Sequence, residues 1–183
     1  MKKFSVKMVV ATAIGAALFF VLGRFVAIPS GIPNTNISVQ YGLLGFIASV
    51  FGPVAGLLAG LIGHFLIDFS YGWGVWWSWV IASAVCGLII GIVCMKLKID
   101  DGEFETKGIF TFNIGQVIAH VVSWIVVAPV LDILMYQEPA NKVFVQGAVS
   151  AGVNIITTGI IGTLLCLAYA KAIPKKGSLK EEE

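Results

Sequence analysis

Charged residues are scarce in this sequence. Only 12% of its 183 residues are Asp, Glu, Lys or Arg, whereas 58% are hydrophobic and the mean hydropathy is +0.94. Soluble domains carry about 25% charged residues, so this composition excludes a soluble enzyme or binding domain. The few basic residues form no patch large enough for nucleic acid, which excludes nucleic acid as a partner. The composition therefore predicts a protein embedded in the lipid bilayer.

The sequence also lacks the motifs of catalysis, ATP binding and metal binding. It contains no H-E-x-x-H, no G-x-S-x-G and no phosphate-binding G-x-x-x-x-G-K-[ST]. Cys86, Cys94 and Cys166 fall inside apolar runs without metal-ligand spacing, which is typical of buried small apolar residues. We therefore expect no catalytic residue, no metal and no cofactor. Active transport by such a chain would need an ion gradient or an ATP-hydrolysing partner.

Apolar runs of membrane-spanning length fill most of the chain. Because a helix needs about 20 apolar residues to cross the hydrocarbon core, the runs predict an all-α polytopic bundle in one domain, 1–183. The six predicted transmembrane helices cover 6–28, 37–51, 53–69, 73–95, 108–131 and 143–172. The run 37–69 is divided at Gly52-Pro53, where proline removes a backbone donor and glycine permits a turn. The turn formers of Pro29–Asn36 predict an ordered or gating loop on the outer side.

The distribution of lysines predicts the orientation. Cytoplasmic loops are rich in Lys and Arg, and with six spans only Arg24 and Lys142 lie on the outer side. The other side then holds Lys2, Lys3, Lys7, Lys96, Lys98, Lys107, Lys171, Lys175, Lys176 and Lys180. An undivided helix over 37–69 would give five spans and would place the lysine-rich ends on opposite sides. We therefore expect a multi-pass protein of the bacterial cell membrane with both termini in the cytoplasm.

Polar side chains inside the predicted spans are candidates for a binding cavity, because each is costly in hydrocarbon without a partner or water. They are His64, Asp68, Gln116, His120, Ser123, Gln146 and Asn154. We expect His64 and Gln116 to form interhelical hydrogen bonds, and His120 and Asn154 to contact a ligand. A cavity that opens outward between the last three predicted helices would collect several of these side chains.

Aromatic residues gather in Phe69–Trp79, which contains four of the five tryptophans. Such rings can form an interfacial belt that faces lipid, or they can form the wall of a pocket, and the sequence leaves both alternatives open. Pocket walls of this kind suit flat heteroaromatic ligands and cationic rings. In the last outer loop, the charges of Asp132, Glu138 and Lys142 are expected to be solvated.

Small residues recur at helical spacing in two of the predicted helices. The pattern Ala13-x-x-x-Ala17 lies in the first helix, and Ala55-x-x-x-Ala59 lies in the third. Such spacing lets two helices approach closely in lipid. We expect the third helix to use this face for packing within the bundle, and the first helix to offer a docking surface for a partner.

With these features, the chain resembles the S components of energy-coupling factor (ECF) transporters, which are small six-helix vitamin-binding subunits that associate with a membrane scaffold subunit and two ATPases. It is particularly similar to a family of S components from Gram-positive bacteria. The similar stretches cover nearly the whole chain and are Gly31–Asn36, Phe51–Pro53, Gly60–His64, Trp76–Trp79, Phe112–Gln116, Ala128–Asp132 and Glu138–Asn141.

The resemblance implies roles for individual residues. The Ala-x-x-x-Ala pattern on the first helix of S components contacts the scaffold subunit, so Ala13 and Ala17 are the expected docking residues. Ligands of S components bind near the outer surface, among the first loop, the last three helices and the outer loops. The expected substrate-binding residues are Asn34, Asn36, Trp76, Trp79, His120, Trp124, Gln146 and Asn154.

The resemblance implies a non-enzymatic subunit of an ECF-type ABC importer that binds a water-soluble vitamin or precursor, while partner subunits hydrolyse ATP. Hydroxymethylpyrimidine or a thiamine-like compound is the expected substrate, since similar S components are linked to these compounds. The alternative is a stand-alone, ion-coupled secondary transporter or channel for a small solute. That protein would use His64, Asp68 or His120 as an ion relay.

Overall fold

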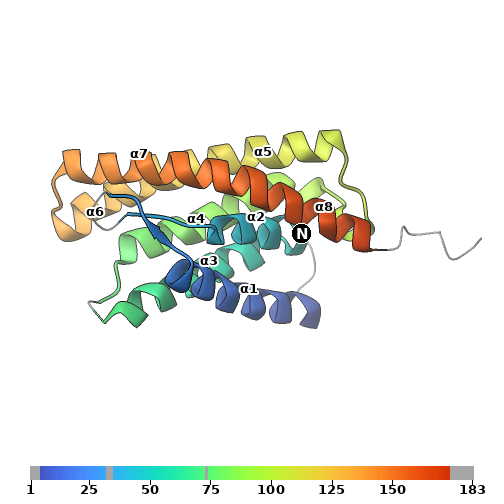
Figure 1. The fold of residues 1–183 in the computed structure, drawn as a ribbon, viewed down its shortest axis with the longest axis horizontal. Coiled ribbons are helices and arrows are strands. Elements are labelled where there is room, and N and C mark those ends of the chain that lie inside the picture. The colour runs from blue at the N-terminus through green and yellow to red at the C-terminus, as the bar shows by residue number, and fades with distance from the viewer. Residues whose placement is uncertain (1–4, 32–34, 73, 174–183) are drawn as a thin grey trace, which may run out of the picture.

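The computed structural model describes residues 5–31, 35–72 and 74–173, and most of these residues are helical (Figure 1). The α-helices are α1 (Val6–Phe25), α2 (Gln40–Phe51), α3 (Pro53–Tyr71), α4 (Trp77–Val93), α5 (Thr106–Val121), α6 (Ala128–Tyr136), α7 (Ala140–Thr157) and α8 (Thr163–Ala172). Two π-helical segments, η3 (Val122–Val127) and η4 (Thr158–Gly162), join α5 to α6 and α7 to α8. The chain after α4 forms two short 3-10 turns, η1 (Cys94–Lys96) and η2 (Ile99–Asp101).

The fold is an all-helical membrane bundle, as the composition predicts. Five helical segments are long and apolar enough to cross a membrane, namely Val6–Phe25, Pro53–Tyr71, Trp77–Lys96, Thr106–Tyr136 and Ala140–Ala172. The remaining helix, α2, has only 12 residues, and nine of them are buried. It lies in the middle of the bundle and contacts α1, α3, α4, α7 and α8 (Figure 1). The count of six spans and the cytoplasmic termini remain predictions.

Glycine and proline determine where the first helices end. Gly52 has a φ of 98°, which favours glycine, and Pro53 then begins α3, where its missing N–H costs no helical hydrogen bond.

Helix α1 ends at Phe25, earlier than predicted. The chain after it forms β1 (Ile28–Pro29), which pairs antiparallel with β2 (Asn36–Ile37).

The later helices also differ from their predicted bounds. Helix α4 begins at Trp77, and Gly74 shortly before it adopts a φ of 100°, which is incompatible with an α-helix. The segments 106–136 and 140–172 are both longer than predicted, so only residues 137–139 connect them. Gln137 makes this short turn with a left-handed φ of 56°. Several residues of the sequence predictions lie outside the described residues, namely Asn34, Trp73, Lys2, Lys3, Lys175, Lys176 and Lys180.

Small residues of α3 pack against α4 and α1. Ala55 and Ala59 are 0% and 1% exposed, which confirms that this face serves packing within the bundle. A Cβ atom added to Gly56 would lie 2.5 Å from the carbonyl oxygen of Gly87 in α4, so the two backbones are in direct contact. Helices in lipid associate through such close packing, since no hydrophobic force drives them together.

This contact predicts that Gly87→Ala destabilises the bundle, because the new Cβ would lie 2.2 Å from the Gly56 carbonyl oxygen. Overpacking of this kind costs about 1–3 kcal/mol, so the thermal midpoint of the detergent-purified protein should fall. Gly152→Ala is the matched control, since a Cβ there meets nothing within 4 Å. Equal midpoints for the two variants would contradict the packing account.

Candidate ligand-binding site

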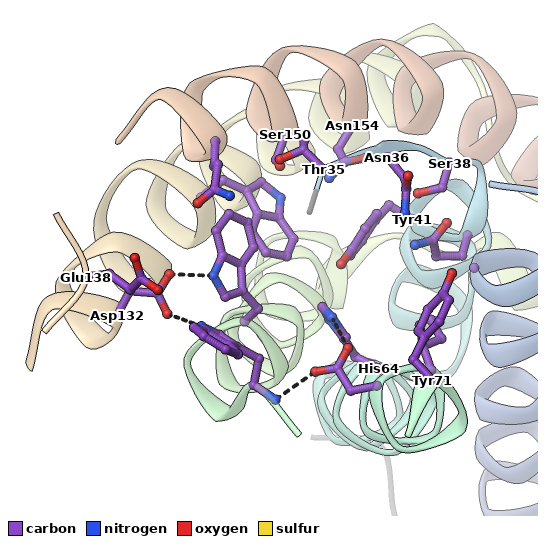
Figure 2. A pocket seen from close by; sticks show the side chains of 18 of the residues that line it. Thr35, Asn36, Ser38, Tyr41, His64, Tyr71, Asp132, Glu138, Ser150 and Asn154 are labelled. Atoms are coloured by element: carbon purple, nitrogen blue, oxygen red, sulfur yellow. Dashed lines mark hydrogen bonds and ion pairs between the residues drawn. The ribbon is translucent and has the colours of Figure 1, made fainter. Parts of the chain in front are cut away.

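A cavity of about 490 Å³ lies between strand β2 and helices α1 to α4, α6 and α7, with η3 on one side (Figure 2). Small-molecule sites have volumes of about 300–1,000 Å³. Aromatic, amide, hydroxyl and charged side chains form the lining, which comprises Gly23, Thr35, Asn36, Ser38, Gln40, Tyr41, His64, Ile67, Asp68, Tyr71, Trp76, Trp79, Trp124, Asp132, Glu138, Lys142, Gln146, Ser150 and Asn154.

Asp132 in α6 orients two of the aromatic rings. Its side chain is 1% exposed, and its carboxylate accepts hydrogen bonds from Trp76 Nε1 at 2.6 Å and from Trp79 Nε1 at 2.7 Å (Figure 2). The hydroxyl of Ser78 donates a third hydrogen bond to the same carboxylate. The prediction that Asp132 is solvated is therefore wrong. Helix α6 continues to Tyr136 and carries Asp132 into the interface with α4.

The rings form an aromatic wall. Trp79 stacks on Trp124 of η3 with the centroids 5.6 Å apart, and Tyr41 of α2 meets Trp124 edge-on at 5.2 Å. Trp76 packs on Tyr136 at 4.6 Å. Trp77, in contrast, does not line the cavity and is 44% exposed. Of the two alternatives for this tryptophan-rich segment, Trp76 and Trp79 therefore form a pocket wall, whereas Trp77 faces outward.

Helix α7 contributes a row of polar side chains at intervals of four residues. Residues spaced four apart lie on one face of a helix, and this face carries Lys142, Gln146, Ser150 and Asn154 into the cavity. Glu138 precedes the helix at the same interval and forms an ion pair with Lys142 at 2.7 Å. The row gives the cavity both hydrogen-bond donors and acceptors.

His120 lies behind the wall, and it does not line the cavity. It is 0% exposed, and Trp124 Nε1 donates a hydrogen bond to its Nδ1 at 2.9 Å. Because Nδ1 accepts this bond, the proton of the neutral ring is on Nε2, which donates to Thr158 Oγ1 at 2.9 Å. His120 thus helps to fix the position of Trp124 from outside the cavity, and its predicted contact with a ligand stays a prediction.

Two further polar residues form the interhelical hydrogen bonds expected from the sequence. His64 Nδ1 of α3 lies 2.5 Å from Ser83 Oγ of α4. Gln116 of α5 donates to the carbonyl oxygen of Ile155 in α7 at 3.3 Å. Both predictions are confirmed, although His64 also lines the cavity.

The structure brings most of the predicted substrate-binding residues together. Asn36, Trp76, Trp79, Trp124, Gln146 and Asn154 all line the cavity. The sequence prediction omitted Tyr41 and Ser150, although Ser150 could have been found from the four-residue interval in α7. The part of the chain that the structure describes contains no cluster of three His, Cys, Asp or Glu side chains suited to a metal ion.

A helical membrane bundle with an aromatic and polar cavity defines a membrane protein that binds a small solute. The chain matches the family described as "ECF-type riboflavin transporter, S component" over residues 3–171. It therefore belongs to this family of S components, which are transport proteins.

The chain is also similar to known relatives and to one solved structure. UPF0397 proteins of Staphylococcus aureus strains MSSA476 and Newman are each 54% identical over 184 residues, and the match covers 100% of this chain and of theirs. The crystal structure of an S component for biotin from an ECF-type ABC transporter is 18% identical and has a TM-score of 0.65. That match covers 88% of this chain and 89% of the other, so the two proteins share a fold.

We expect Asp132→Asn to destabilise the protein and to loosen the aromatic wall. The amide keeps one acceptor oxygen, but its N–H₂ group faces one of the two indole N–H groups and cannot accept from it. Each hydrogen bond to a charged group contributes about 1.5–3 kcal/mol, and the charge is lost in this variant. The thermal midpoint and the near-ultraviolet circular dichroism of the tryptophans measure this effect.

Glu138→Gln is the control for this variant, because it removes a partly exposed ion pair worth about 0–1 kcal/mol. Asp132→Asn should lower the midpoint more than Glu138→Gln does. Identical midpoints and identical tryptophan spectra would show that Asp132 does not hold the indoles.

Proposed function

We propose that this chain is the substrate-binding membrane subunit of an ECF-type importer for a small water-soluble vitamin or vitamin precursor. The observation that carries the proposal is the cavity whose indole rings are held in place by the buried carboxylate of Asp132. Rings fixed before the ligand arrives lose little conformational entropy on binding, which favours tight capture of a dilute solute.

The lining supports a flat heteroaromatic substrate. Trp79 is partly exposed and lines the cavity, so it offers an aromatic surface to a flat ring, while the almost fully buried Trp124 and Tyr41 support it. The amides of Gln146 and Asn154 can donate hydrogen bonds to ring nitrogens and accept them from exocyclic amino groups. Hydroxymethylpyrimidine and thiamine-like compounds combine these features and are our proposed substrates.

The outer face of α1 supports docking to a membrane scaffold subunit. Ala13 and Ala17 are both exposed on the described bundle, and the larger side chains of Ile14 and Leu18 beside them are 55% and 45% exposed. Small side chains let a second helix approach closely in lipid. Because the sequence has no ATP-binding motif, we propose that a scaffold subunit and two ATPases energise the import across the bacterial cell membrane.

Titration of the purified subunit with vitamins tests the proposed binding function. Hydroxymethylpyrimidine, thiamine, pyridoxine, riboflavin and biotin form a suitable panel, and the intrinsic fluorescence of the tryptophans is the readout. We expect a saturable change with one member of the panel, because Trp76, Trp79 and Trp124 line the cavity.

No fluorescence change with any compound of the panel, together with no heat of binding in calorimetry, would contradict the proposal.

One observation supports the alternative, an ion-coupled transporter. His64 Nε2 lies 3.7 Å from the Asp68 carboxylate in the cavity wall, so the two side chains could relay an ion. Uptake by the purified subunit alone, in liposomes with a pH gradient, would support that alternative.

The double variant Ala13→Trp, Ala17→Trp tests the docking face. Two indoles on this face should block the close approach of a partner helix, so uptake in cells and copurification with the scaffold subunit should be lost. Ligand binding by the isolated subunit should remain, because neither residue lines the cavity.

Ile156→Trp, Ile160→Trp is the matched control, since both side chains are exposed on a different helical segment, at 63% and 58%. This control should retain uptake and copurification. If the Ala13 and Ala17 variant also retained both, α1 would not be the docking face.

A further inference from the structure

We infer that the cavity selects a ligand with a positively charged ring, and that the carboxylate of Asp68 is the counter-charge for that ring. The inference rests on the proposed function and narrows its substrate class. It follows from how each charged side chain of the described lining is already engaged within the protein.

Three carboxylates belong to the described part of the lining, and two of them are already compensated by protein groups. Asp132 accepts hydrogen bonds from Trp76, Ser78 and Trp79. Glu138 is paired with Lys142 at 2.7 Å. Neither carboxylate therefore needs a charged ligand, because protein groups already compensate it.

Within the described lining, Asp68 differs from the other two carboxylates, because it has no lysine or arginine beside it, unlike Glu138, and fewer hydrogen-bond donors than Asp132. Its Oδ2 accepts one hydrogen bond, from the backbone N–H of Trp76 at 2.9 Å. Its Oδ1 lies 3.7 Å from His64 Nε2, which is longer than a hydrogen bond. A carboxylate has about four acceptor positions, so Asp68 retains capacity for a ligand. Its side chain is only 14% exposed, and partial removal from water strengthens its attraction for a cation.

His64 is held beside Asp68 by a separate chain of hydrogen bonds. His64 Nδ1 lies 2.5 Å from Ser83 Oγ, and Ser83 Oγ lies 2.8 Å from the hydroxyl of Tyr41. The chain fixes the imidazole at its present distance from Asp68. It thereby connects the imidazole beside Asp68 to Tyr41, which is part of the aromatic wall.

The remaining charges around the cavity also favour a cation. Within the described lining, Lys142 is the one lysine or arginine, and its charge is matched by Glu138. Three carboxylates thus face one ammonium group. The aromatic rings add to this preference, because the faces of Trp and Tyr attract cations within about 6 Å. A ligand that carries a carboxylate would be repelled by the carboxylates of the lining.

The inference predicts that the cavity distinguishes two ligands of the same shape by their charge. Thiamine carries a positively charged thiazolium ring, whereas in deazathiamine a neutral thiophene replaces it. The full-length subunit in detergent should bind thiamine at least about tenfold more tightly than deazathiamine, because a hydrogen bond or ion pair to a charged, partly buried group contributes that much affinity. Calorimetry measures both dissociation constants.

Asp68→Asn assigns the effect to one side chain. It should weaken thiamine binding by about tenfold or more and change deazathiamine binding by less than about threefold. Retained binding of deazathiamine shows that the variant is folded. Glu103→Gln is the control, since this carboxylate lies outside the cavity and its side chain is 61% exposed. It should leave both dissociation constants unchanged.

Three results would overturn the inference, and they are distinguishable from failure of the proposed function. Equal affinity of the wild-type protein for thiamine and deazathiamine would show that the cavity does not select its ligand by charge. Equal weakening of both compounds by Asp68→Asn would show the same for Asp68. Binding of riboflavin or biotin without binding of thiamine would preserve the proposed function and contradict the cationic substrate. If no compound binds at all, the proposed function fails, and the inference fails with it.

Discussion

The buried carboxylate of Asp132 is the interaction on which the cavity depends. A charge taken out of water is costly unless several donors compensate it, and here the donors are two indole N–H groups and one hydroxyl, all from Trp76–Trp79. This arrangement joins α4 to α6 and sets the orientation of both indoles. Trp79 then stacks on Trp124, and His120 holds Trp124 from behind. The shape of the wall is thus determined before any ligand is present.

The bundle around the cavity is built by close backbone contacts. Gly87 lets α4 meet α3, and Gly147 lets α7 meet η3, where an added Cβ would lie 2.0 Å from the carbonyl oxygen of Trp124. The short helix α2 lies at the centre and brings Tyr41 into the wall. The ligand site and the proposed docking face on α1 consequently use different surfaces of the same bundle, as the proposed subunit that both captures a solute and joins a larger complex requires.

The sequence predicts the fold class, the division at Gly52-Pro53 and several polar residues of the cavity, such as Asn36, Gln146 and Asn154, because apolar length, turn formers and intramembrane polar groups are local signals. It does not predict how each helix is rotated, since packing against neighbouring helices sets the rotation. His120 was therefore expected in the cavity, although it lies behind Trp124. Asp132 was placed in a solvated loop because the helix continues five residues beyond its predicted end at 131. The proposed role of Asp68 depends on which groups surround each charged side chain of the lining, and tertiary packing determines these neighbours.

The measurement that tests this account most directly is an experimental structure of the subunit with its ligand bound. We predict that the ligand lies against Trp79 and Trp124, with its ring within reach of Asp68, and that the hydrogen bonds from Trp76 and Trp79 to Asp132 are retained. A ligand bound outside this cavity, or indoles released from Asp132 in the bound state, would contradict the account.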